Sequence, residues 1–273
     1  MSKKIILMVL VVSMLITFAG CGAQSSEKDN DGKKVSKIDE IKKAGKMVLG
    51  TSADYPPYEF HKLINGKDEI AGFDIEVAKL IAADLGVELE IVDMKFEGLL
   101  AALVTDDVDF VIAGMSRDPE REKTVDFSNI YYETEHRMLV RTEDKDKFTT
   151  PEDLAGLKVG AQKTTEQEKV VLEKFSESEY VGISKITDLI LELQNKKIDA
   201  VILAKPVAEA YEKQNSDLFM TEINLGKEAG YSVAINKGNS DLLELINNTL
   251  DKLVKEGKVD TLLNEAIILS EQE

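Results

Sequence analysis

From about residue 37 onward, apolar residues follow two alternating patterns, one typical of strands and one typical of helices. Short runs rich in Val, Ile and Leu predict buried strands, and they lie at residues 46–52, 87–94, 108–114, 158–162 and 199–204. Amphipathic stretches separate them; in residues 76–86, Val77 and Ile81 share a face and Gly86 supplies a C-cap. This alternation is typical of an α/β protein with largely parallel strands.

Local signals mark further helices. Thr150 is expected as an N-cap, followed by Pro151 as first helical residue and by Gly156 as the end of the helix. The C-terminal residues 241–267 predict two helices that are broken at Gly257.

One pattern occurs twice. The sequence LLAALVTDDVDFVIAG at 99–114 aligns with LILELQNKKIDAVILA at 189–204, so that Asp109 matches Asp199. Two such units predict two similar lobes, although short apolar runs also match by chance. Because ligands bind beyond the carboxyl ends of strands in open α/β sheets, Gly114 and Ala204 are expected to face each other across a cleft.

The N-terminus carries a targeting signal. Lys3 and Lys4 precede an apolar run, so residues 1–20 are interpreted as a signal peptide, and the polar residues 21–36 as a flexible tether. The letters FAGC resemble the lipobox of bacterial lipoproteins, which implies that Cys21 is lipidated with palmitate, although Phe18 stands where that family prefers leucine. An ordinary signal peptide with an incidental cysteine is the alternative.

Composition narrows the choice of partners. A formal net charge of −17 disfavours nucleic acid and anionic lipid. Cys21 is the single cysteine, and His61 and His136 are the two histidines, so no zinc site and no Cys/His nucleophile is recognisable. We expect no metal and no cofactor, and we expect both histidines at the surface or at the rim of a site.

A charged segment follows the strand at 108–114. Asp118 is expected as an N-cap with Pro119 as the first helical residue, which places Arg121 in the opening turn. Backbone donors and a guanidinium group together suit a carboxylate ligand. A solvated helix start is the alternative interpretation.

Three motifs, in this order, resemble one family. TSADYPPYEF at 51–60, GFDIEVAKLIAADLG at 72–86, and the elements of residues 96–128 are similar to the bacterial solute-binding proteins that deliver polar amino acids to ABC importers. The resemblance implies an α/β, two-lobed periplasmic-binding-protein-like (type II) fold with two crossing hinge strands, near residues 137–141 and 230–236. Lobe 1 would hold residues 37–138 plus 235–273, and lobe 2 residues 139–234.

The same resemblance implies a ligand site. Arg121 would hold the α-carboxylate of an amino acid, and Tyr55 and Phe96 would sandwich its side chain; without the family, both aromatics would be read as core packing. The remaining lobe 1 positions implied are Ser52, which is often acidic in binders of cationic amino acids, and Ala113, Gly114 and Ser116, which would contact the carboxylate and ammonium groups.

Lobe 2 departs from the family pattern. Ala204 stands where an acidic residue usually pairs with the ligand's α-ammonium group, and QKTTEQE replaces a glycine-threonine turn. Thr165 and Glu166 are therefore the lobe 2 candidates. Either Glu166 supplies the missing charge, or the ligand has no free α-amine, or Glu166 only interacts with a helix dipole.

The expected function is capture of a polar amino acid by a monomeric, membrane-anchored, extracytoplasmic receptor that delivers it to ABC permease subunits. The receptor is expected not to be an enzyme, and no catalytic residue is assigned. One alternative is an enzyme similar to cyclohexadienyl dehydratase, with Glu166 or Glu168 as the acid. The other is a module that presents ligand to a signalling partner.

Overall fold

The computed structural model describes residues 36–272. The expected signal peptide, nearly all of the tether, and Cys21 lie outside these residues. Within residues 36–272, no helix combines the length and the apolar character that a membrane crossing requires.

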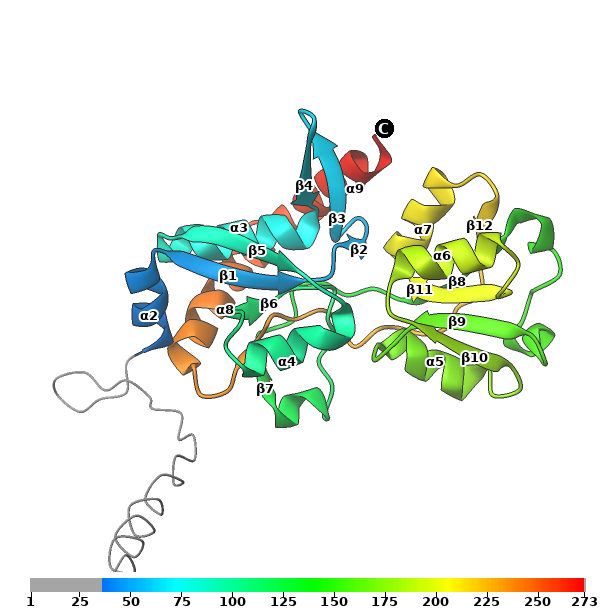
Figure 1. Cartoon of the computed structure of the whole chain (residues 1–273), viewed down its shortest axis with the longest axis horizontal. Helices are drawn as coiled ribbons and strands as arrows, with labels where there is room; N and C mark the ends of the chain where they lie inside the picture. The colour runs from blue at the N-terminus through cyan, green and yellow to red at the C-terminus, as the bar shows by residue number, and fades with distance from the viewer. Residues whose placement is uncertain (1–35, 273) are drawn as a thin grey trace, which may run out of the picture. The chain divides into compact units, whose positions relative to one another are not determined.

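Two five-stranded sheets share one strand order (Figure 1). The first runs β5 (Glu88–Asp93), β1 (Lys46–Thr51), β6 (Phe110–Val111), β13 (Ala234–Asn236) and β7 (Val125–Phe127). The second runs β10 (Glu179–Ile183), β9 (Lys158–Gln162), β11 (Ala200–Ala204), β8 (His136–Arg141) and β12 (Leu218–Met220). In both, the first three strands are parallel and the fourth is antiparallel to its two neighbours. The predicted α/β fold with two similar lobes is confirmed.

Helices pack on both faces of each sheet. Met47 and Leu49 of β1 join the core that contains α3, whereas Val48 faces the core that contains α4. In the second lobe the same alternation places Val201 toward α6 and Ile202 toward α5. The helices are α2 (Lys37–Ala44), α3 (Phe73–Leu85), α4 (Leu99–Val104), α5 (Glu166–Lys174), α6 (Ile186–Gln194), α7 (Lys205–Gln214), α8 (Ser240–Lys255) and α9 (Lys258–Glu271).

Glycine ends the helices where the sequence predicted. Gly86 after α3 and Gly257 between α8 and α9 both adopt positive φ, a conformation that residues with a Cβ rarely take. At residues 150–156 the prediction is only partly right. Thr150 and Asp153 form a capping box, but the element is the short 3₁₀ turn η5 (Pro151–Leu154) rather than an α-helix.

The repeated motif has a structural basis in its aspartates. Asp109 Oδ2 accepts a hydrogen bond from the Val48 backbone N–H at 2.8 Å, and Asp199 Oδ2 accepts one from the Lys158 N–H at 3.0 Å. Asp109 also pairs with Lys37 at 2.9 Å. Each aspartate therefore ties the start of its own strand to the neighbouring parallel strand, so the match is not accidental.

The chain passes between the sheets twice, through residues 128–135 and 221–233. β8 enters the second sheet at His136, so this passage lies before the expected boundary at residue 138. The two passages pair with each other through the bridges Tyr132 to Tyr231 and Glu135 to Lys227. A three-stranded sheet completes the fold: β2 (Asp54–Tyr55), β3 (Glu59–Ile64) and β4 (Lys67–Ala71).

Asp109→Ala should lower the free energy of unfolding by about 1–3 kcal/mol, because it leaves the Val48 N–H without its acceptor and removes the nearest ion-pair partner of Lys37. Urea unfolding measures the change, with Asp146→Ala, an exposed aspartate, as the control. Equal stability of the two variants would contradict the structural role of the repeat.

Candidate functional site

Both lobes line one narrow cavity. Lobe 1 contributes residues from β2, β3, η2 (Phe96–Gly98) and the loops after β1 and β6; lobe 2 contributes residues from β9 and the start of α5. The lining residues are Ser52, Asp54, Tyr55, Glu59, Phe96, Ala113, Gly114, Gln162, Thr165 and Gln167. Six of the nine residues predicted for the ligand site lie in this list. The other three, Ser116, Arg121 and Glu166, are not among the lining residues.

Arg121 lies at the junction of the lobes with its side chain 11% exposed. Its guanidinium group donates to the backbone carbonyl of Ser116 and, at 2.7 Å, to that of Thr164 in lobe 2. Burial lowers the pKa of Arg121, and the charge of Asp118 opposes this shift. The guanidinium carbon lies 5.4 Å from the centre of the Phe96 ring, a cation–π distance. A desolvated cation thus bridges the two lobes.

The expected helix at Arg121 is the single 3₁₀ turn η3 (Arg121–Lys123). Capping by Asp118 is nevertheless present, since its Oδ1 accepts from the N–H groups of Glu120 at 2.8 Å and Arg121 at 3.1 Å. The turn stops early because Val125 already enters β7. The prediction of a helix N-terminus as an anion site was therefore wrong, and the guanidinium group is what remains for an anion.

Gly114 is held from behind the cavity. Its backbone N–H donates to Asp74 Oδ2 at 2.7 Å, and Tyr131 donates to Asp74 Oδ1 at 2.8 Å. With φ at +52°, a Cβ at this position would approach Tyr55 to 2.9 Å. Glycine is therefore required by both conformation and space, and its N–H is already used by Asp74.

Tyr55 and Phe96 both line the cavity and are each 8% exposed. Tyr55 stacks on Tyr58 with ring centres 5.7 Å apart, while its hydroxyl lies 3.3 Å from the Gln167 side chain. Both rings also belong to hydrophobic cores. Tyr55 and Phe96 therefore pack in the hydrophobic cores and also form part of the cavity wall.

Two buried acidic residues that line the cavity were not identified from the sequence. Asp54 accepts from the Ile186 backbone N–H of lobe 2 at 2.7 Å, and burial raises its pKa to about 6. Burial, followed by the charge of Asp74, raises the pKa of Glu59 well above its usual range. Both residues stand inside the motif at 51–60, which is the signal that could have drawn attention to them.

This architecture has known counterparts. Residues 47–267 match the model of the bacterial extracellular solute-binding proteins, family 3. The chain belongs to this family.

Relatives of this solute-binding protein are named for amino acids. The arginine-binding extracellular protein ArtP of Bacillus subtilis is 36% identical over 93% of this chain and 95% of its own. A crystal structure of AbpA from Streptococcus pneumoniae bound to L-arginine superposes with a TM-score of 0.83 at 36% identity, covering 86% of this chain and 100% of AbpA. The ancestral amino acid-binding protein AncCDT-1, a precursor of cyclohexadienyl dehydratase, gives 0.77 at 34% identity, covering 85% and 100%.

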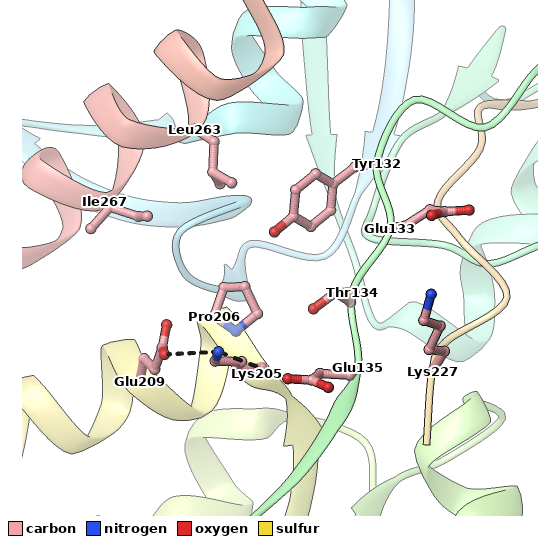
Figure 2. Close-up of a pocket in the computed structure, with 10 residues that line it drawn as sticks. All are labelled: Tyr132, Glu133, Thr134, Glu135, Lys205, Pro206, Glu209, Lys227, Leu263 and Ile267. Atoms are coloured by element: carbon pink, nitrogen blue, oxygen red, sulfur yellow. Dashed lines mark ion pairs between the residues drawn. The ribbon is translucent and has the colours of Figure 1, made fainter. Parts of the chain in front are cut away.

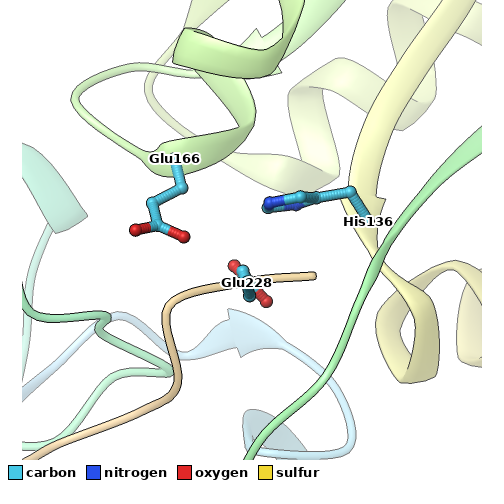
Figure 3. A group of neighbouring side chains, drawn as sticks. All are labelled: His136, Glu166 and Glu228. Atoms are coloured by element: carbon cyan, nitrogen blue, oxygen red, sulfur yellow. The ribbon is translucent and has the colours of Figure 1, made fainter. Parts of the chain in front are cut away.

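A second group of polar side chains lies near Arg121. Figure 3 shows His136, Glu166 and Glu228, whose nearest ligand atoms all lie within 4.8 Å of one another. Glu228 comes from the second passage between the lobes, where no strand or helix pattern predicted a site residue. The expectation that His136 lies at the surface or at the rim of a site was wrong: it is buried, with 3% of its surface exposed, and burial lowers its pKa to about 4. His61 is exposed, as expected.

A larger pocket of about 420 Å³ lies elsewhere, lined by residues of the two passages, α7 and α9 (Figure 2). Lys205 forms ion pairs there with Glu135 at 3.8 Å and Glu209 at 3.9 Å. Its charged residues are partly or fully exposed. The narrow cavity, with its buried charges, is the stronger candidate for specific recognition.

The free energy of unfolding should fall as the pH rises from 6.5 to 8. Glu228 is buried and its pKa is raised from 4.5 to about 8, first by burial and then by the neighbouring charge of Glu166. In this window Glu228 holds a proton in the folded protein that it has lost in the unfolded chain, so its contribution to the slope is negative and at most about 1.4 kcal/mol per pH unit. His136 titrates below this window.

Urea unfolding of the ligand-free protein at pH 6.5, 7.25 and 8 measures this slope. Glu228→Gln should make the slope less negative, and Glu222→Gln, at an exposed residue of the same passage, should leave it unchanged. An unchanged slope in Glu228→Gln would show that Glu228 is already ionised at pH 6.5.

Proposed function

We propose that the narrow cavity is the ligand site of the extracytoplasmic substrate-binding component of an amino acid ABC importer. The observation that carries this proposal is the buried guanidinium group of Arg121, which lies where both lobes meet and beside the Phe96 ring. A guanidinium group binds a carboxylate through two parallel hydrogen bonds. The family and the amino acids named in its relatives support the same assignment.

The ligand proposed is a cationic amino acid, with arginine as the first choice. Asp54 and Glu59 are buried acids in the lining, and Glu228 accepts a hydrogen bond from Gln167 of the same lining. Ser52 is not acidic, but its hydroxyl lies 3.3 Å from Asp54 Oδ1. Asp54 therefore places a carboxyl group beside the position that is often acidic in binders of cationic amino acids. Relatives named for arginine support this choice.

Closure of the lobes accompanies capture. Contacts from lobe 2 reach lobe 1 directly, since the Ile186 N–H binds Asp54 and the Thr164 carbonyl accepts from Arg121. A ligand that contacts both walls favours the conformation in which these contacts exist, and a permease can distinguish that conformation from the open one. In this proposal Thr165 lies at the lobe 2 wall and Ala113 and Gly114 at the lobe 1 wall, while the Ser116 carbonyl accepts a hydrogen bond from Arg121.

The proposal also includes the lobe boundaries and the attachment of the protein to the membrane. Lobe 1 would comprise residues from 37 to about 135 and from about 232 onward, and lobe 2 the segment between. Cys21 would carry the acyl chains that hold this monomeric receptor at the membrane, beside its permease.

Arg121→Ala should weaken L-arginine binding by about 30-fold to several thousand-fold, because it removes one partner of a desolvated charge pair. Isothermal titration calorimetry at pH 7.5 measures the change. Arg117→Ala removes an exposed arginine that pairs with Glu122 and should leave affinity unchanged. Equal and small losses in both variants would remove Arg121 from the site.

Cys21→Ser should release the protein from the membrane fraction and leave ligand affinity unchanged, because stable anchoring needs acyl chains on that cysteine. Fractionation of cells labelled with a palmitate analogue measures both anchoring and acylation. Wild-type protein that takes up no label would rule out the lipoprotein assignment.

The dehydratase alternative receives one supporting observation, the similarity to AncCDT-1. Of its two candidate acids, Glu168 accepts hydrogen bonds from the Thr164 N–H and the Tyr180 hydroxyl, both at 2.7 Å, so it stabilises the loop before α5. Glu166 accepts from the Ala229 N–H at 3.0 Å. Incubation of the protein with the dehydratase substrate, followed by ultraviolet detection of an aromatic product, tests this alternative.

A further inference from the structure

The charged groups near Arg121 are complementary to the two charges of an α-amino acid. Arg121 donates to the Thr164 carbonyl, two residues before Glu166, and Gln167 of the cavity wall donates to Glu228, so a cation and two acids meet around the start of α5. A free α-amino acid carries its carboxylate and its ammonium group on one carbon atom and therefore presents the opposite pair at short range.

We propose that Glu228, with Glu166 and His136, forms the site for the ligand's α-ammonium group, which restricts the substrates to amino acids with a free α-amine. This inference rests on the proposed function, because it assumes that the carboxylate of the same ligand binds Arg121. It assigns the counter-charge to a residue of the second passage and not to the end of β11.

Hydrogen-bond donors of the protein already hold both carboxylates in place. Gln167 donates to Glu228 Oε1, and Tyr231 donates to Oε2 at 2.9 Å. The Ala229 N–H donates to Glu166 Oε2 at 3.0 Å. A carboxylate oxygen has two lone pairs, so each can accept a further hydrogen bond from an incoming ammonium group.

His136 completes the set of acceptors. Its Nδ1 is buried and has no hydrogen-bond partner in the part of the chain that the structure describes. Since its pKa lies at about 4, the ring is neutral at physiological pH and one of its nitrogens is an acceptor. In the sheet His136 pairs with Ala204, so the imidazole stands beside the uncharged residue at the end of β11.

An ammonium ion suits this cluster better than a metal ion does. Two carboxylates and a neutral imidazole offer hydrogen-bond acceptors, which the three N–H donors of an ammonium group can satisfy. In addition, an amino acid brings its own carboxylate to neutralise Arg121, whereas a metal ion adds a second like charge.

Binding should release a proton. In the free protein Glu228 has a pKa of about 8, raised by burial and by Glu166 on α5, and lowered by its hydrogen bonds from Tyr231 and Gln167 and by Arg121 of η3. His136 of β8 is neutral, and Tyr55 of β2 carries no charge in this range. An ammonium group favours ionised Glu228, so affinity should rise with pH between 6.5 and 8.

The test is calorimetry with L-arginine and with 5-guanidinopentanoic acid, which is arginine without its α-amine. Wild type, Glu228→Gln and the exposed control Glu222→Gln are titrated at pH 7 in phosphate and in Tris, whose different ionisation enthalpies report the protons released. The analogue tests the wild-type protein directly, so the outcome does not depend on the folding of a variant.

We expect wild type and Glu222→Gln to bind L-arginine at least about 100-fold more tightly than the analogue and to release up to one proton. Glu228→Gln should bind L-arginine about 10- to 100-fold more weakly, release no proton and discriminate less against the analogue. Glu166→Gln should show a smaller loss, because Glu166 is only half-buried.

Tight binding of the analogue to wild type, or unchanged L-arginine affinity and proton release in Glu228→Gln, would overturn the inference while leaving the proposed function intact. Binding of Zn²⁺ to the ligand-free protein that is lost in Glu228→Gln would also overturn it in favour of a metal site. If wild type binds none of the proteinogenic amino acids, the proposed function itself fails.

Discussion

A guanidinium group removed from water between two lobes is the constraint on which the rest of the site depends. Arg121 is held by carbonyl groups from both lobes, by the face of Phe96 and by an ion pair with Asp118 at 3.4 Å. Acidic residues lie around it, Asp118, Glu166 and Glu228 among them, and burial raises the pKa of Glu228 to about 8. A ligand that carries both charges can satisfy cation and acids together, which explains why one small cavity provides affinity and specificity.

The duplicated lobe architecture delivers these groups to one place. Because both sheets share a strand order, the ends of β6 and β11 are equivalent positions. Asp109 and Asp199 fix the starts of the neighbouring strands in the same way, so the opposite ends project toward the cavity in a defined register. The two passages between the lobes then add residues that neither lobe supplies alone, Glu228 among them.

Sequence patterns predicted the parts of the fold that depend on local chemistry. Helix α3 and its Gly86 cap, the break at Gly257 and the strands β1, β5 and β9 follow from periodicity and from glycine conformation. Six of the predicted site residues share the cavity, mostly because family motifs marked them. Their contacts with ligand stay a prediction.

What the sequence did not predict depends on tertiary contacts. The helix expected at Arg121 is a single 3₁₀ turn, because strand β7 already begins at Val125. Glu228 lies in a segment without periodicity, and the burial of His136 follows from its pairing beside Ala204.

The most direct measurement is a crystal structure with L-arginine: the account predicts the ligand carboxylate on Arg121 and its ammonium group among Glu228, Glu166 and His136. Arginine in the pocket of Figure 2, or bound with its carboxylate away from Arg121, would contradict it.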